Sequence, residues 1–172
     1  MAETRALTKA ALGSAVFFVL APGCVVGLVP WWLTGWRMRT WAVGGVLLQT
    51  AGAVLLVAGL AVLSHSFVRF VVEGRGTPAP VAPPNRLVVR GFYRFVRNPM
   101  YVGILAAIVG QALLLAQPVL LAYGAVVWAA FASFVYAYEQ PTLRARYGTD
   151  YDAYRRAVPA WWPRLRPWQR DP

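Results

Sequence analysis

Three long stretches of the sequence contain no Lys, Arg, Asp or Glu: residues 10–36, 40–68 and 98–138, with lengths of 27, 29 and 41 residues. A helix needs about 20 apolar residues to cross the hydrocarbon core of a bilayer. The first two stretches are long enough for one span each and the third for two, with Gln117-Pro118 offering a turn. We therefore expect a single all-α membrane domain, residues 1–172, with about four transmembrane helices near residues 11–33, 41–66, 100–116 and 119–138.

The positive charges predict how these spans are oriented. Of the 17 Lys and Arg residues, 15 fall in the N-terminal segment, the second loop and the C-terminal tail, and only Arg37 and Arg39 fall in the first loop. By the positive-inside rule, both termini are expected on the cytoplasmic side. The net charge of +11 would suggest nucleic acid in a soluble chain. Here we expect bilayer lipids as the partner and no nucleic acid.

Residues with metal or redox chemistry are scarce. Cys24 is the only cysteine, so an internal disulfide is impossible, and it lies inside the first expected span. His65 is the only histidine, at the cytoplasmic end of the second expected span. It is either a proton acceptor or an interfacial residue bonded to a neighbour. Without a cluster of Cys or carboxylates around it, we expect no metal site.

Small residues and prolines predict local packing. Gly45, Gly52 and Gly59 recur every seven residues and predict a stripe for close helix packing in lipid. Pro22 removes a backbone donor and predicts a kink in the first span. The proline-rich loop of residues 74–86 is either a linker or, as we favour, a rigid cover over a cytoplasmic pocket.

The segment from Arg97 to Gly103 joins the basic second loop to the third expected span. Asn98-Pro99 predicts a helix start at Pro99, because Asn is a favoured N-cap and Pro is favoured at the first helical position. The positive end of that helix can receive an anion. From the residues alone, Arg94 and Arg97 are equally well explained as arginines that anchor the chain at the membrane surface.

Glu139 ends the fourth expected span and is the only carboxylate between Glu73 and Asp150. An ionisable residue at the edge of a span suggests function, although a salt bridge to an arginine is the alternative. Pro141 is expected to interrupt the span and start a short helix that ends at Gly148. A second helix should follow, with tyrosines on one face, and then a tail along the membrane surface that carries Trp161, Trp162 and Trp168.

In combination, these motifs resemble the isoprenylcysteine carboxyl methyltransferase family, which includes phospholipid N-methyltransferases. The resemblance covers about residues 74–163. The family pattern Arg-His-Pro-x-Tyr-x-Gly matches residues 97–103, and its Glu-Glu pair matches Glu139-Gln140 ahead of Tyr147-Gly148. Asn98 stands where relatives carry His, and Gln140 stands where they carry the second Glu. The proline-rich loop and Gly91-Phe92-Tyr93-Arg94 resemble bacterial members, which implies the bacterial inner membrane.

The resemblance implies S-adenosylmethionine as cofactor, held between residues 74–99 and 139–163, and a lipophilic substrate entering from the bilayer. Glu139 would pair with the cofactor ammonium, and Arg94 or Arg156 would hold a substrate carboxylate. The residues implied to bind the cofactor are Tyr93, Arg97, Asn98, Pro99, Tyr101, Gly103, Glu139, Gln140 and Tyr147.

The substrate remains open between several classes. A carboxylate nucleophile needs no general base, whereas a protonated amine must first lose a proton. Only His65 and Glu139 are nearby candidate bases, which favours O-methylation of an acid over N-methylation of a lipid amine. Two other readings are a membrane reductase that uses NADPH, for which four spans are few, and a non-catalytic protein that retains the fold.

Overall fold

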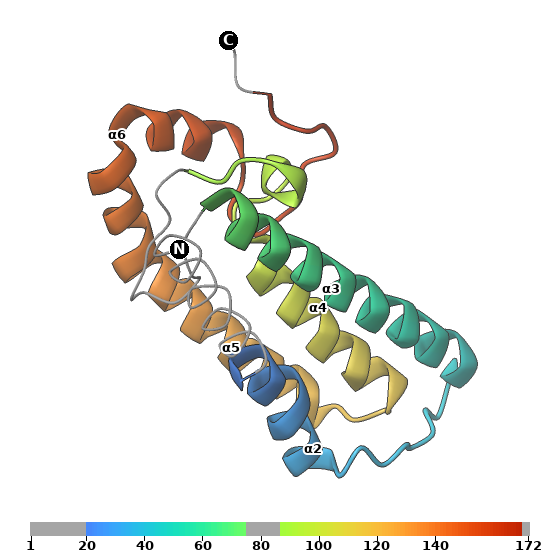
Figure 1. Cartoon of the computed structure of the whole chain (residues 1–172). Helices are drawn as coiled ribbons and strands as arrows, with labels where there is room; N and C mark the ends of the chain where they lie inside the picture. The colour runs from blue at the N-terminus through green and yellow to red at the C-terminus, as the bar shows by residue number, and fades with distance from the viewer. Residues whose placement is uncertain (1–19, 75–86, 170–172) are drawn as a thin grey trace, which may run out of the picture.

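The computed structural model describes residues 20–74 and 87–169, and within these ranges every regular element is a helix (Figure 1). This confirms the predicted all-α class for the described part of the chain. The elements are η1 (Gly23–Leu28) and α2 (Val29–Thr34) within the helix Leu20–Thr34, α3 (Gly45–Gly74), η2 (Gly91–Arg94), α4 (Pro99–Leu114), α5 (Val119–Phe134), η3 (Val135–Glu139) and α6 (Gln140–Ala157).

Within the described ranges, two helices are long and apolar enough to cross a membrane. One runs from Gly45 to Phe70, and the other is the continuous helix Val119–Ala157. The apolar helices Leu20–Thr34 and Pro99–Leu114 are shorter. Residues 11–19 of the expected first span and residues 75–86 of the proline-rich loop lie outside the described residues. The number of spans therefore stays a prediction.

Helices α3 and α4 lie side by side and touch through their backbones (Figure 1). A β-carbon on Gly59 would lie 2.7 Å from the amide nitrogen of Ala107 and 2.7 Å from the carbonyl oxygen of Gly103. One on Gly110 would lie 2.8 Å from the carbonyl oxygen of Gly52. The predicted stripe is thus confirmed at Gly52 and Gly59, which meet a matching pair on α4, Gly103 and Gly110. Such close approach is how helices associate in lipid, where dispersion replaces the hydrophobic effect.

The predicted stripe is wrong at its first member. A β-carbon on Gly45 would lie 3.8 Å from Trp41 Cβ, which is ordinary van der Waals contact. Gly45 is the first residue of α3, below the end of α4, so no helix backbone faces it.

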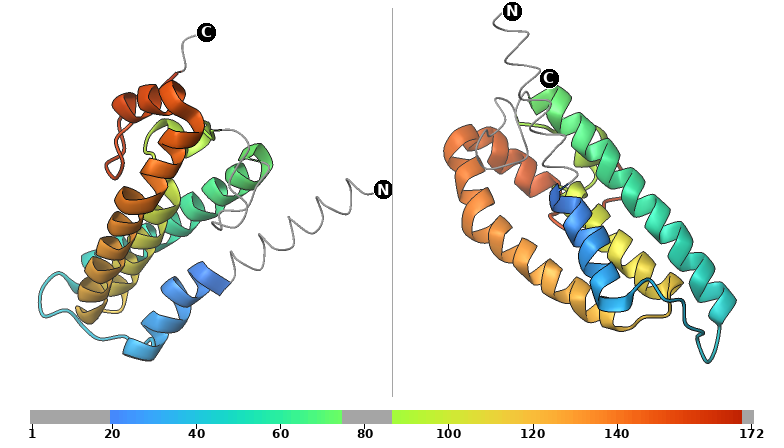
Figure 2. Two further views of the ribbon diagram at one scale, coloured as in Figure 1. Left: turned by 90° about the vertical axis from the view of Figure 1, so that its left-hand side faces the viewer. Right: turned by 60° about the horizontal axis from the view of Figure 1, so that its bottom comes forward.

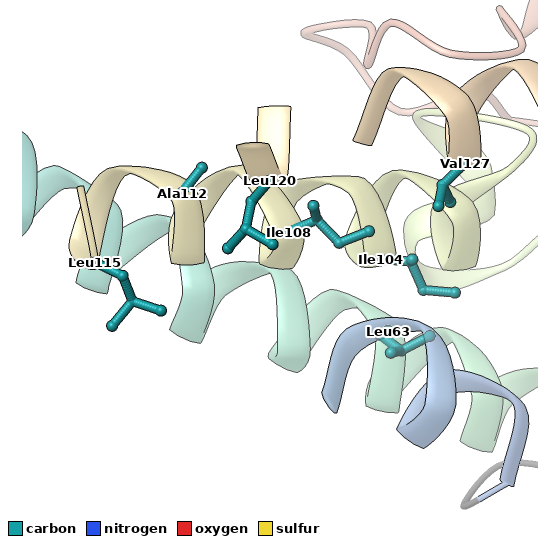
Figure 3. Close-up of a cluster of buried hydrophobic side chains, with 7 residues drawn as sticks. All are labelled: Leu63, Ile104, Ile108, Ala112, Leu115, Leu120 and Val127. Atoms are coloured by element: carbon teal, nitrogen blue, oxygen red, sulfur yellow. The ribbon is translucent and has the colours of Figure 1, made fainter. Parts of the chain in front are cut away.

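Helix α4 contributes more side chains to the buried core of the bundle than any other helix. Ile104, Ile108 and Ala112 from α4 pack with side chains from α3, from α5 and from the turn between α4 and α5 (Figure 3). The buried members of this cluster are Leu63, Ile104, Ile108, Ala112, Leu115, Leu120 and Val127. Apolar burial on both sides fixes how α4 is rotated, and hence which way its first turn faces.

The first described helix, Leu20–Thr34, lies against α4 and α5 (Figure 2). Side chains of these two helices donate to carbonyl oxygens that have no backbone donor because of Pro30. Pro30 has no N–H, so it cannot donate to Val25 or Val26, five and four residues earlier. The Gln111 Nε2 atom donates to the carbonyl oxygen of Val26 at 2.8 Å, and the Tyr123 hydroxyl donates to that of Val25 at 2.9 Å. In lipid, groups freed by a proline must be satisfied by neighbouring helices. The π-helical turns of η1 begin directly after Pro22. The two side-chain hydrogen bonds, however, replace the backbone donor that is missing at Pro30.

We expect Gln111→Leu to destabilise the protein by about 1–3 kcal/mol, because the carbonyl oxygen of Val26 loses this buried donor. Unfolding in mixed detergent micelles measures the change. Gln49→Leu is the matched control, since Gln49 Nε2 donates to the carbonyl oxygen of Arg39 near the surface at 3.3 Å. Equal stability of the two variants would contradict the role given to Gln111.

The helix that begins as α5 continues through η3 into α6 without the interruption predicted at Pro141. The wider π turn of Val135–Glu139 immediately precedes the proline, and Glu139 and Gln140 keep helical backbone angles. A π turn displaces the carbonyl that a proline ring would otherwise strike. The predicted break at Gly148 is confirmed, because its φ of 52° and ψ of −126° divide α6 into two pieces. The second piece turns across the end of the bundle (Figure 1).

Candidate functional site

The first turn of α4 and the end of η3 meet at one end of the bundle. Helix α4 starts at Pro99, as predicted, but the Asn98 side chain does not cap it. Asn98 is buried, and its Nδ2 atom donates to the carbonyl oxygen of Ala160 at 3.1 Å. The expectation that Asn98 keeps a capping role is therefore wrong, because its amide is used to hold the C-terminal tail.

Tyr101 and Glu139, 38 residues apart in the sequence, are in contact. The Tyr101 hydroxyl donates to Glu139 Oε2 at 3.4 Å, and its ring stacks on Phe131 with a centroid distance of 4.4 Å. The stacking holds the Tyr101 ring against α5, the helix that leads to Glu139. The structure thus brings the two predicted halves of the site together across the α4–α5 hairpin.

Glu139 lies just beyond the expected fourth span in a largely apolar setting. Burial raises the pKa of its carboxyl, while the hydrogen bond from Tyr101 and the positive charge of Arg97 pull that pKa back down. The burial effect is the largest of the three. Burial thus makes this carboxylate costly to ionise, Arg97 opposes that effect, and groups with such perturbed pKa values gather at functional sites.

Arg97 approaches the carboxylate from the loop before α4. Its Nη1 atom donates to the Tyr151 hydroxyl at 3.3 Å, and its backbone N–H donates to the carbonyl oxygen of Pro159 at 2.9 Å. Its Nε atom is buried and has no hydrogen-bond partner among the described residues. Burial raises the pKa of Tyr151, and Arg97 opposes that shift. Arg97 thus retains one unused donor close to Glu139.

The C-terminal tail returns over the loop that precedes α4. The backbone N–H of Arg164 donates to the carbonyl oxygen of Phe95 at 2.9 Å, and that of Trp168 donates to Arg94 at 2.9 Å. The Tyr154 hydroxyl donates to the carbonyl oxygen of Tyr93 at 2.6 Å. Sequence reasoning missed this arrangement, because backbone bonds between two irregular segments leave no residue pattern.

Several predicted site residues are used in this packing. Arg94 Nε donates to the carbonyl oxygen of Trp168 at 2.8 Å. Tyr93 is buried beneath α6, and Gly103 is buried against α3. Tyr147 packs with the buried cluster of Tyr151, Tyr154 and Val158, 5.9 Å from the Arg146 guanidinium. Arg156 is exposed. Their proposed contacts with ligands stay predictions.

A cavity of about 560 Å³ opens at the elbow between the two pieces of α6. It is lined by Tyr136, Gln140, Pro141, Arg144, Ala145 and Arg155. Of the predicted cofactor residues, Gln140 alone appears in this lining; its Nε2 atom is buried without a partner among the described residues. Arg144 and Arg155 were missed as site candidates, because the turn at Gly148 folds residues 11 positions apart onto one opening. Arg144 Nε also pairs with Asp152 Oδ1 at 3.3 Å.

A family model described as phospholipid methyltransferase matches residues 47–150. Protein-S-isoprenylcysteine O-methyltransferase B of Arabidopsis thaliana is 29% identical over 131 residues, which cover 76% of this chain and 59% of that protein. Protein-S-isoprenylcysteine O-methyltransferase A of the same plant is 27% identical over 129 residues, covering 74% and 58%. The chain spans a little under three fifths of these relatives.

Proposed function

Because the chain belongs to the phospholipid methyltransferase family, we propose that it is an integral membrane methyltransferase that uses S-adenosylmethionine and acts on a lipophilic acceptor. We further propose four membrane spans with both termini in the cytoplasm, in the bacterial inner membrane. The matched residues 47–150 include the first turn of α4 and Glu139. The proposal therefore concerns the end of the bundle where these two meet.

The observation that carries the proposal is the half-buried Glu139, whose carboxylate accepts a hydrogen bond from Tyr101 and whose pKa is raised by burial and pulled back down by the nearby Arg97. The amino-acid part of S-adenosylmethionine carries one ammonium and one carboxylate. Glu139 fits the ammonium, and the unused Nε donor of Arg97 fits the carboxylate. The ammonium and the carboxylate of the cofactor would thus each meet a protein group that has few hydrogen-bond partners in the free protein.

When bound, the cofactor supplies an electrophilic methyl group on a sulfonium. The residues of this chain bind and orient it, and they exclude water from the transfer. The Tyr101 ring, fixed on Phe131, and the tyrosines of α6 offer faces for adenine or for cation–π contact with the sulfonium. Alignment of the reacting atoms is the main contribution a protein makes to such a transfer.

The acceptor that the site favours is a carboxylic acid. Glu139 is engaged by Tyr101, and His65 packs its ring against Phe92 with a centroid distance of 5.1 Å. Neither is placed as a free base, and a carboxylate needs none. Both plant relatives are named as O-methyltransferases. Arg155, which lines the elbow cavity, joins Arg94 and Arg156 as a candidate to hold the acid.

Isothermal titration calorimetry of the purified protein in lipid nanodiscs tests the proposal. We expect S-adenosylmethionine to bind and NADPH not to bind. Binding of NADPH alone would favour a reductase, and binding of neither would reject a cofactor-dependent enzyme. A screen with radiolabelled methyl donor and membrane lipid extract then separates base-labile methyl esters from stable N-methyl products.

A further inference from the structure

Residues 161–167, here called the tail loop, hold two unusually exposed apolar side chains. Trp162 is 82% exposed and Leu165 is 99% exposed. They stand on either side of Pro163 and Arg164. Large apolar side chains this open to solvent mark a surface that contacts something else when they are held in a fixed arrangement.

The tail loop is held at both ends and in its middle. Before it, the carbonyl oxygens of Pro159 and Ala160 accept hydrogen bonds from Arg97 and Asn98. Within it, Arg164 donates to the carbonyl oxygen of Phe95, and just after it Trp168 donates to that of Arg94. The exposure of Trp162 and Leu165 therefore belongs to a fixed loop shape and is not the fraying of a chain end.

The loop lies beside the helices and not beyond their ends. The Trp161 ring is 6.3 Å from the Trp128 ring and 6.4 Å from the Tyr101 ring, measured between centroids. Its Nε1 atom donates to the Tyr136 hydroxyl at 3.3 Å. Trp128 is in the middle of α5, within the expected fourth span. The next residue, Trp162, does not share these contacts and is exposed.

The charges around the loop suit the surface of a bilayer. No Asp or Glu occurs from residue 153 to residue 169, whereas Arg155, Arg156, Arg164 and Arg166 do. Arg164 Nη1 is used to donate to the carbonyl oxygen of Ala157 at 2.9 Å, and Arg166 is exposed. Arginine next to tryptophan is the usual composition where a chain meets anionic headgroups.

We propose that the tail loop is inserted into the bilayer interface, with Trp162 and Leu165 among the lipid chains and Arg166 at anionic headgroups. The hydrogen bonds that Arg164 in the loop and the residues flanking it make with Arg94, Phe95, Arg97 and Asn98 join this lipid contact to the segment before α4. The inference needs the protein to be in a membrane but does not depend on methyl transfer.

Site-specific labelling tests the insertion. On a Cys24→Ala background, single cysteines are introduced by Trp162→Cys and Leu165→Cys and labelled with a polarity-sensitive fluorophore in nanodiscs. Val126→Cys on α5, 68% exposed, is the lipid-facing control, and Thr149→Cys, exposed after the break in α6, is the aqueous control. Lipids that carry a doxyl quencher near the headgroup or near the chain end report depth.

We expect both tail-loop labels to be blue-shifted and quenched most by the lipid with its doxyl group near the headgroup. Labels that match Thr149→Cys would overturn the insertion. Blue-shifted labels that no doxyl lipid quenches would also overturn it, since they would indicate contact with protein, such as a second copy. The two positions are independent, so misfolding of one variant leaves the other decisive.

The headgroup contact has its own measurement. Quenching of the label at Leu165→Cys should increase when phosphatidylglycerol replaces part of the phosphatidylcholine, and Arg166→Gln should remove that increase. An increase that Arg166→Gln leaves unchanged would overturn the role of Arg166.

Discussion

Replacing Glu139 with glutamine is expected to abolish most binding of S-adenosylmethionine while leaving the protein at least as stable as the wild type. The carboxylate is the proposed partner of the cofactor ammonium, and truncating one side of a buried charge pair costs about 2–5 kcal/mol, or at least tenfold in affinity. Glutamine keeps the size of the side chain and an oxygen that accepts from Tyr101. Calorimetry measures the affinity, and thermal unfolding in detergent measures the stability.

The expected stability of Glu139→Gln follows from the sign of the pKa shift of Glu139. Burial raises the pKa of Glu139 above that of the unfolded chain. Below the pKa of the unfolded chain, the Glu139 side chain is neutral in both states. As pH rises from that pKa to the higher pKa of the folded state, the folded state loses stability relative to the unfolded state. Above the pKa of the folded state the loss of stability is constant, so replacing Glu139 with an uncharged side chain restores this stability at neutral pH. A purely structural glutamate would behave in the opposite way, since its loss would destabilise the protein.

The same shift predicts how binding depends on pH. A bound ammonium lowers the pKa of Glu139. Cofactor binding therefore releases a proton at any pH where Glu139 is protonated in the free protein but ionised in the complex. Affinity should increase with pH between the lower pKa of the complex and the raised pKa of the free protein, and level off above it. In Glu139→Gln this dependence should disappear.

Asp150→Asn is the matched control for these measurements. It removes the same charge from an exposed position on α6. We expect cofactor affinity and its pH dependence to stay as in the wild type. If Asp150→Asn weakened binding as much as Glu139→Gln, the site would respond to net charge and not to this carboxylate.

Replacing Gly59 with alanine should destabilise the bundle by about 3 kcal/mol or more. The new methyl group would meet the backbone nitrogen of Ala107 and the carbonyl oxygen of Gly103 at 2.7 Å. Backbone atoms cannot rotate away as a side chain can, so α3 and α4 must separate and lose contact along their length. Unfolding in mixed micelles measures the loss, and Gly110→Ala is expected to act similarly from the other helix.

Gly45→Ala tests whether close approach is the cause. The substitution is the same, on the same helix and in the same row of the sequence, but its neighbour is at an ordinary 3.8 Å. Alanine favours helix over glycine by up to about 1 kcal/mol, so we expect Gly45→Ala to be neutral or slightly stabilising. A similar loss from Gly45→Ala and Gly59→Ala would contradict the packing argument.

Features that depend on only a few adjacent residues could be predicted from this sequence. The helix start at Pro99 and the break at Gly148 follow from backbone preferences of single residues, and both are confirmed. The meeting of Tyr101 with Glu139 follows from the hairpin between them. Pro141 was misjudged because the sequence does not show that a π turn precedes it.

What could not be predicted depends on pairs of residues far apart. The contact of Gly103 with α3 appears only when the two helices are packed. The tail is held by backbone groups, whose partners carry no signal in residue type. Arg155 reaches the elbow cavity only because Gly148 turns the chain.

The hydrogen bonds to Val25 and Val26 have a consequence for how the protein is made. These carbonyls belong to a hydrophobic segment that is synthesised before α4 and α5, and their side-chain donors, Gln111 and Tyr123, follow 85 and 98 residues later. Until then, the segment has no access to either donor. Its final position is therefore set only after both helices of the α4–α5 hairpin have been synthesised, so synthesis of this helix and its assembly into the bundle are separate events.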